Sequence, residues 1–157
     1  MADKTVAPGR KVPDFTLPAT GGKPFKLSAA KGRKLVVYFY PKDATSGCTQ
    51  EGIDFRELHA QFRKAGADIL GISPDSLASH EKFKAKYEFP FELAADVDKT
   101  ACALFDVYKE KSMYGRKYMG VERSTFLIDE QGVLRQEWRK VKVKDHAAAV
   151  LAAVRDA

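Results

Sequence analysis

Cys48 is one of two cysteines in this 157-residue chain, and its surroundings favour reactivity. It closes the segment 41–48, which reads Pro-Lys-Asp-Ala-Thr-Ser-Gly-Cys and stands between an apolar run and a helical pattern. A cysteine reacts as a thiolate, and the free backbone N–H groups in the first turn of a helix stabilise an anion. We therefore expect a nucleophilic thiol at Cys48. The alternative is a buried packing residue, which is the usual state of a free cysteine.

The residues just before Cys48 suit attack on an oxygen–oxygen bond. Thr45 or Ser46 is a natural N-cap for the helix. Gly47 removes a side chain beside the sulfur, and the Thr45 hydroxyl can both accept from and donate to a bound peroxide. Pro41 would fix the loop and shield the sulfur from water, which strengthens local charge interactions. A cysteine in the first turn of a helix, behind such a loop at the end of a central strand, is therefore placed for reactivity.

The same residues resemble a known family. The pattern Pro41-x-x-x-Thr45-x-x-Cys48 matches the active-site signature of the peroxiredoxins. The run 38–43, leading into Gly47-Cys48-Thr49, resembles the bacterioferritin comigratory protein (peroxiredoxin Q) branch, as do the segments 12–17, 68–73 and 118–129. The resemblance implies a thiol-dependent peroxidase that reduces hydrogen peroxide and organic hydroperoxides without a cofactor. Cys48 would become a sulfenic acid.

Two further site residues follow only from the resemblance. Arg123 would be the catalytic cation that stabilises the Cys48 thiolate and holds the peroxide oxygens with its planar donor fork. Taken alone, Arg123 reads as a surface arginine at the start of a strand. Glu51 also matches the branch, although an acid near a helix N-terminus is favoured by the dipole in any case. Both interpretations of Glu51 stay open.

The sulfenic acid must be reduced by another thiol before it oxidises further. Where members of this branch carry a resolving cysteine, this chain has Ile53 and Lys84. Cys102 is the remaining internal candidate, but it stands three residues before Phe105 in a short apolar segment, so core packing also explains it. We expect a one-cysteine cycle with an external reductant: thioredoxin, glutaredoxin or a small thiol. A two-cysteine cycle resolved by Cys102 is the alternative.

The elements expected around these residues describe one α/β domain over residues 1–157. Strands are expected at 34–40, 67–72 and 91–95, and a hairpin joins two more at 124–129 and 133–138. Helices are expected at 48–64, after Ser73-Pro74, at 99–105 and after a cap at Asp145. The helical faces carry Phe55, Leu58 and Phe62; His80, Phe83 and Tyr87; and Val150, Leu151 and Val154. This order predicts a thioredoxin-like three-layer sandwich with a central mixed sheet.

Composition and charge restrict the partners. The net charge is +6, and all of this excess lies in residues 1–34, which hold eight basic and two acidic residues. The remaining residues hold nineteen basic and nineteen acidic residues, so their charges balance. Few aromatic side chains accompany this charge, so we expect a solvated surface rather than a nucleic-acid site. The start lacks the apolar stretch of an export signal and no apolar run suits a bilayer. We expect a cytoplasmic monomer with no membrane partner.

Other functions are less well supported by the sequence. A thioredoxin-type oxidoreductase needs a cysteine three residues after Cys48, where Glu51 stands. The chain shows no paired zinc-ligand spacing among its cysteines and histidines, so we expect no metal and interpret the histidines as surface or packing residues: His59, His80 and His146. A cysteine–histidine hydrolase would need a histidine beside Cys48, but His59 is about 16 Å along the same helix. A non-enzymatic binding or chaperone domain on the same fold is the remaining alternative.

Overall fold

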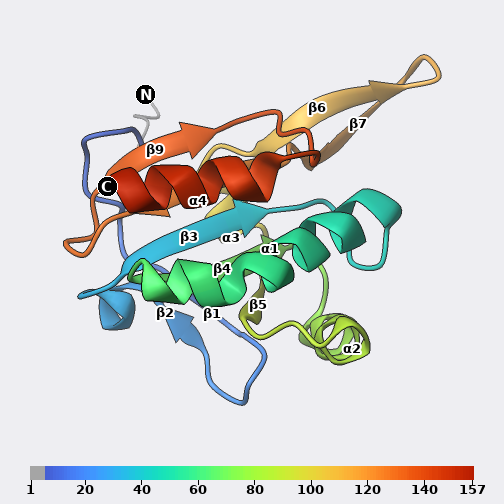
Figure 1. Ribbon diagram of the computed structural model, residues 1–157. Helices are drawn as coiled ribbons and strands as arrows, with labels where there is room; N and C mark the ends of the chain where they lie inside the picture. The colour runs from blue at the N-terminus through green and yellow to red at the C-terminus, as the bar shows by residue number, and fades with distance from the viewer. Residues whose placement is uncertain (1–5) are drawn as a thin grey trace.

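A mixed sheet of five strands forms the centre of the computed structural model, which describes residues 6–157 (Figure 1). The strand order is β5-β4-β3-β8-β9. Strands β3, β4 and β5 are parallel to one another, β8 is antiparallel to β3, and β9 is antiparallel to β8. The strands are β3 (Lys34–Phe39), β4 (Ala67–Ser73), β5 (Glu92–Ala95), β8 (Ser124–Ile128) and β9 (Leu134–Trp138). Each strand expected from the sequence is present within one or two residues. The mixed central sheet and its β8–β9 hairpin are confirmed.

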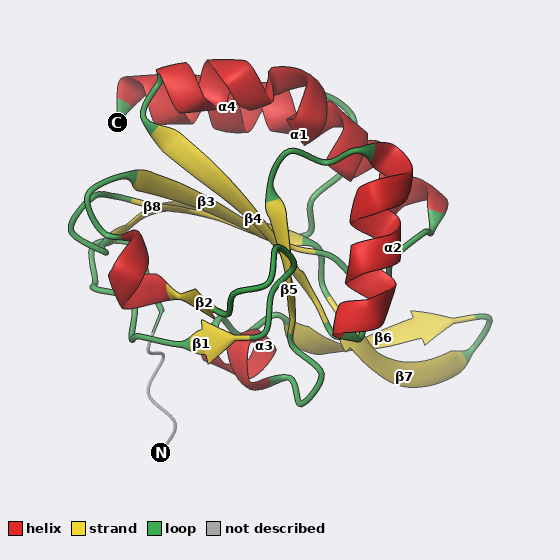
Figure 2. Cartoon of the chain, turned by 90° about the horizontal axis from the view of Figure 1, so that it is seen from below, coloured by secondary structure: helices red, strands yellow, loops and turns green. Residues whose placement is uncertain are grey.

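Helices and short strands cover the two faces of this sheet and complete the three layers. On one face, α1 (Ser46–Lys64) and α4 (His146–Asp156) run side by side, and α2 (Leu77–Tyr87) lies next to β5 (Figures 1 and 2). The opposite face carries α3 (Thr100–Leu104), the two-stranded sheet of β1 (Thr16–Leu17) and β2 (Phe25–Lys26), and the 3-10 helix η1 (Leu27–Ala30). The expected three-layer α/β architecture is therefore confirmed.

Strand β3 is apolar along most of its length because both of its faces are buried. Side chains alternate between the faces of a strand. Val36 and Tyr38 join the hydrophobic cluster under α1 and α4, while Leu35, Val37 and Phe39 join the cluster on the opposite face. A strand buried on both faces needs apolar residues at consecutive positions. The two clusters lie on opposite sides of the sheet.

Helix α1 follows the amphipathic pattern expected for it. Phe55 and Phe62 are fully buried, and Leu58 packs against the same cluster. The helix ends at Lys64, and Gly66 takes a φ of +87°, a left-handed conformation that favours glycine after a helix. The helix begins at Ser46, two residues earlier than expected, with Thr45 as the N-cap residue.

One expected helix start is wrong, and a second is correct in position but lacks a side-chain capping hydrogen bond. Ser73 is the last residue of β4, and α2 begins only at Leu77, where the Ser76 hydroxyl accepts a hydrogen bond from the Ser79 amide at 3.1 Å. Asp145 does precede α4, but its φ is +61° and its side chain makes no capping hydrogen bond. Ser76 rather than Ser73 therefore caps α2, and Asp145 precedes α4 without capping it through its side chain.

The hairpin formed by β6 (Tyr108–Met113) and β7 (Arg116–Val121) was not predicted. It projects from the body of the protein (Figure 1), and most of its side chains are at least partly exposed. Its strands therefore lack the alternation of apolar and polar residues from which a strand is predicted. The expectation about an export signal concerns the start of the chain, where residues 1–5 lie outside the described residues. Among residues 6–157, no helix is long and apolar enough to cross a bilayer.

Candidate active site

Cys48 lies in the first turn of α1, beneath the loop that leaves β3. The first hydrogen bond of the helix runs from the Thr49 amide to the Thr45 carbonyl at 2.9 Å, so the amides of Ser46, Gly47 and Cys48 precede it. Cys48 is 1% exposed and belongs to the cluster under α1 and α4. Its sulfur is thus shielded from water and close to the positive end of a 19-residue helix.

Arg123 reaches this thiol from the other side of the site. It stands between β7 and β8, and the pairing of β8 with β3 brings it to the end of the strand that leads to Cys48. Its Nη2 lies 3.4 Å from the Cys48 sulfur, and its side chain is only 17% exposed. The description of Arg123 as a surface arginine is therefore wrong. Its guanidinium can stabilise negative charge on the sulfur.

Glu51 is the second partner of this guanidinium. Nη1 of Arg123 donates to Oε1 of Glu51 at 2.6 Å, and the Glu51 side chain is 1% exposed. Burial raises the pKa of Glu51 to about 7, although the charge and hydrogen bond of Arg123 oppose the shift. Burial alone would lower the pKa of Arg123, but attraction to Glu51 and Cys48 outweighs it and raises that pKa. The contact with Arg123 favours a role for Glu51 in the site over a simple helix-terminal acid.

Gly47 and Thr45 shape the space around the sulfur. A Cβ atom on Gly47 would lie 3.2 Å from Nη2 of Arg123, so glycine permits the guanidinium to approach the helix. The Thr45 hydroxyl donates to the Lys42 carbonyl at 2.8 Å instead of capping the helix. Its proton is engaged within the loop, which leaves the oxygen lone pairs to accept a hydrogen bond from a ligand. Pro41 is partly buried at the start of this loop.

Cys102 lies on the opposite side of the sheet from Cys48. It is fully buried in α3, within the cluster that does not contain Cys48, and both cysteines are free. Burial, together with a hydrogen bond and charge from Asp96, raises the pKa of the Cys102 thiol far above its usual range. This geometry favours the packing interpretation of Cys102. At the usual resolving positions, Ile53 packs against the core, and Lys84 forms a 2.7 Å ion pair with Glu92.

Sequence reasoning missed a buried polar group behind the active-site loop. Asp43, Asp75 and His80 offer ligand atoms that all lie within 4.8 Å of one another. His80 is fully buried, with one ring nitrogen 2.8 Å from Asp43 and the other 3.0 Å from the Ala94 carbonyl. Its spacing with Phe83 and Tyr87 placed it on the buried side of α2, but only the structure reveals its polar partners.

His59 is partly exposed and packs against Phe91, as expected.

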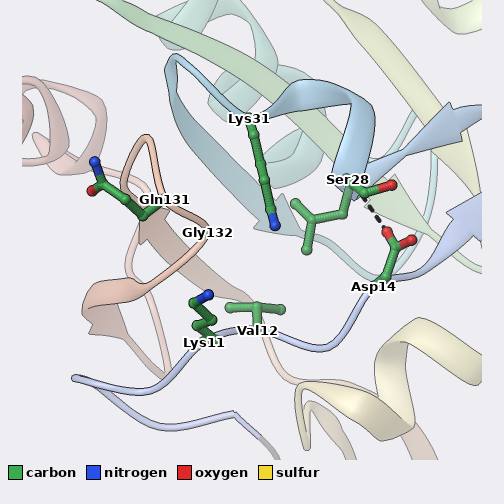
Figure 3. Close-up of a pocket in the computed structure, with 8 residues that line it drawn as sticks. Lys11, Val12, Asp14, Ser28, Lys31, Gln131 and Gly132 are labelled. Atoms are coloured by element: carbon green, nitrogen blue, oxygen red, sulfur yellow. Dashed lines mark hydrogen bonds between the residues drawn. The ribbon is translucent and has the colours of Figure 1, made fainter.

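Two hollows on the surface differ in their relation to this site. A groove of about 530 Å³ follows the start of α1 and is lined there by Ser46, Gly47 and Gln50, with Val143 and Lys144 opposite. A smaller pocket of about 80 Å³ lies between the N-terminal segment and the β8–β9 turn, where Asp14 accepts from the Ser28 amide at 2.9 Å (Figure 3). None of the expected site residues lines this second pocket, whereas Gly47 lines the groove, so of these two hollows the groove is the one that borders the site.

This chain is similar to known proteins along almost its whole length. Residues 8–137 match the family model described as the AhpC/TSA family. Peroxiredoxin Bcp of Bacillus subtilis is 51% identical over 152 residues, 97% of each chain, and Peroxiredoxin Bcp of Xanthomonas campestris is 54% identical over 142 residues, 90% of this chain and 89% of the relative. Among solved structures, Xanthomonas campestris Peroxiredoxin Q has a TM-score of 0.87 at 54% identity, covering 90% of each chain. Xylella fastidiosa PrxQ has a TM-score of 0.91 at 41% identity, covering 96% of each.

Proposed function

Because the chain belongs to the AhpC/TSA family and is a peroxiredoxin, a thiol-dependent peroxidase with the thioredoxin-like fold, we propose that Cys48 is the residue that attacks the hydroperoxide. The observation that carries this assignment is the 3.4 Å contact between the Cys48 sulfur and Nη2 of Arg123. A buried thiol beside a partly buried guanidinium, at the start of a long helix, is supplied with positive charge from two directions.

The proposed reaction begins with the Cys48 thiolate. The sulfur attacks the terminal oxygen of the hydroperoxide, a sulfur–oxygen bond forms, and the oxygen–oxygen bond breaks. The thiolate becomes a sulfenic acid, and the leaving alkoxide or hydroxide takes up a proton to become an alcohol or water. Arg123 stabilises the charge that develops on the two oxygens, and the free amides of the first helical turn assist it. Glu51 holds the guanidinium in the required orientation.

Thr45 and Pro41 would position the hydroperoxide. The lone pairs of the Thr45 hydroxyl can accept the O–H of the hydroperoxide, since its own proton is held by the Lys42 carbonyl. This interaction would align the oxygen–oxygen bond with the sulfur. We propose that Pro41 limits the freedom of the loop and shields the sulfur, which would keep water from competing with the substrate for these donors.

We further propose an external reductant for the sulfenic acid. A first thiol condenses with the sulfenic acid, giving water and a mixed disulfide, and a second thiol releases Cys48 and forms the reductant's own disulfide. Thioredoxin, glutaredoxin and small thiols can all perform these steps. The burial of Cys102 across the sheet supports this one-cysteine cycle over an internal disulfide. Such reductants are found in the cytoplasm, where we place this protein as a single-domain monomer.

Organic hydroperoxides are proposed as substrates together with hydrogen peroxide. A solved structure of the Xanthomonas campestris bacterioferritin comigratory protein, 53% identical to this chain, concerns that protein's alkyl peroxide reduction activity. The groove beside Ser46 and Gly47 could receive the organic part of such a substrate.

The intact mass of the reduced protein after one equivalent of hydrogen peroxide tests the proposal. A gain of one oxygen that is abolished in Cys48→Ser is expected, and it would identify both the nucleophile and the one-cysteine cycle. Loss of two hydrogens would instead reveal a disulfide with Cys102. No rapid change in mass would contradict the assignment of Cys48.

A further inference from the structure

The carboxylate of Asp43 ties the active-site loop to the body of the protein. Its Oδ1 accepts from the Tyr40 hydroxyl at 2.7 Å, and its Oδ2 accepts from the Ser79 hydroxyl at 2.7 Å. His80 Nδ1 lies 2.8 Å from the same Oδ2, and the Asp43 side chain is only 4% exposed. Burial alone would raise the pKa of Asp43, but hydrogen bonds from His80 and Tyr40 outweigh it and lower that pKa. Asp43 is therefore a buried, ionised carboxylate.

Both ring nitrogens of His80 have polar partners. Nε2 faces the Ala94 carbonyl at 3.0 Å, and a carbonyl can only accept, so Nε2 must donate. Nδ1 faces the ionised Asp43 at 2.8 Å, and it also lies 3.4 Å from the Tyr40 hydroxyl, whose own proton is given to Asp43. Both neighbours of Nδ1 are thus acceptors, and His80 and Asp43 form a buried, hydrogen-bonded pair.

The loop that this pair holds has an unfavourable conformation. Ala44, next to Asp43, has a φ of +65°, a left-handed value that is costly for a residue with a Cβ. The Asp43 amide donates to Asp75 at 2.8 Å on one side, and on the other the Thr45 hydroxyl donates to the Lys42 carbonyl. Such a turn persists only where its surroundings fix it. Asp43 supplies this restraint two residues before Thr45 and five before Cys48.

We propose that the buried, hydrogen-bonded pair of Asp43 and His80 positions the active-site loop, so that Thr45 and Cys48 face the hydroperoxide together. Neither residue is proposed to touch the substrate. The inference rests on the proposed function of Cys48, because the loop affects the reaction only through that residue and Thr45. When the pair is broken, the turn at Ala44 relaxes, the peroxide site loosens, and the Cys48 sulfur becomes easier to reach from solvent.

Two reactions of Cys48 distinguish positioning from general damage. Oxidation by hydrogen peroxide needs the ordered site, whereas alkylation by iodoacetamide needs only an accessible thiolate. In Asp43→Asn and His80→Leu, we expect the rate constant for oxidation to fall about tenfold or more and the rate constant for alkylation to rise. Asp96→Asn is the matched control: Asp96 is fully buried and accepts from the Ala101 and Cys102 amides in the opposite layer. The rate constants of Asp96→Asn for oxidation and for alkylation should both match those of the wild type.

A conservative variant and a double variant complete the test. His80→Gln retains a side-chain donor and should oxidise faster than His80→Leu. The double variant Asp43→Asn/His80→Leu should be no slower than the slower of the two single variants, because both substitutions break the same pair. Unchanged oxidation in well-folded variants, or additive losses in the double variant, would overturn the inference. Absence of wild-type oxidation would instead contradict the function proposed for Cys48.

Discussion

Cys48 and Glu51 stand one turn apart on α1, and the guanidinium of Arg123 bridges them, with Nη2 3.4 Å from the sulfur and Nη1 2.6 Å from the carboxylate. Residues three apart on a helix share a face, so one planar fork can contact both. The carboxylate fixes the plane of the guanidinium and thus the direction of the donor that meets the sulfur. The Arg123 side chain therefore supplies positive charge to the Cys48 sulfur, and Glu51 holds that side chain in its orientation.

Arg123→Lys should show that this orientation matters. A lysine keeps the charge but has no planar fork, so it cannot hold Glu51 and face the sulfur in the same way. We expect the second-order rate constant with hydrogen peroxide to fall about 10²-fold, as for the loss of one charge-stabilising donor. Rapid-mixing measurements of Cys48 oxidation provide the rate. Arg139→Lys is a suitable control, because Arg139 is also largely buried, at 23% side-chain exposure, and binds backbone carbonyls away from the site. A near-normal rate in Arg123→Lys would contradict the role of Arg123.

Gly47→Ala should separate activity from stability. The new Cβ would lie 3.2 Å from Nη2 of Arg123 and would displace the guanidinium by a few tenths of an ångström. Alanine is favoured over glycine in a helix by about 0.5–1 kcal/mol, so the free energy of unfolding should stay the same or rise. We expect oxidation of Cys48 to slow several-fold all the same. Urea unfolding and peroxide kinetics on the same preparation test this, and an unaltered rate would mean that Arg123 can move without loss.

The sequence predicted those parts of the fold and site that depend on local patterns. The buried strand 34–40, the apolar face of α1 and the position of Cys48 in the first helical turn can all be read from neighbouring residues. Arg123 could be assigned only through a family resemblance, because it lies 75 positions from Cys48 and meets it through the pairing of β8 with β3. No local pattern encodes that pairing.

The partners of His80 could not be predicted for a related reason. Its helical spacing with Phe83 and Tyr87 indicated a buried side, but its partners Asp43 and Ala94 come from a loop and from another strand. A histidine in an apolar stripe therefore resembled a packing residue. The β6–β7 hairpin was missed because neither of its faces is buried continuously, so its sequence carries little alternation.

Cys102→Ala should leave catalysis unchanged. The Cys102 thiol is fully buried on the side of the sheet away from Cys48, and its raised pKa makes it a poor nucleophile. With a small-thiol reductant in excess, we expect turnover of hydrogen peroxide within about twofold of the wild type. Alanine leaves a small cavity, so the free energy of unfolding should fall by about 1 kcal/mol. A variant that is still oxidised at Cys48 but no longer turns over would restore Cys102 as the resolving residue.

His146 should make the protein less stable in mild acid. It is 7% exposed, and Nε2 lies 2.8 Å from the Thr125 hydroxyl. Burial, aided by the nearby charge of Arg123, lowers its pKa from 6.5 to about 4. The folded protein thus prefers the neutral ring, and its stabilising contribution is present above pH 6.5 and is lost as the pH falls towards 4.

Urea unfolding of the wild type and of His146→Gln between pH 7 and pH 4.5 tests this dependence. Glutamine keeps a polar group beside Thr125 but does not titrate in this range. Since one pKa unit corresponds to about 1.4 kcal/mol, the stability advantage of the wild type over the variant should shrink by about 2 kcal/mol on acidification. Other groups that titrate in both proteins cancel in this difference. Parallel curves for the two proteins would mean that His146 takes up a proton as readily in the folded chain as in the unfolded one.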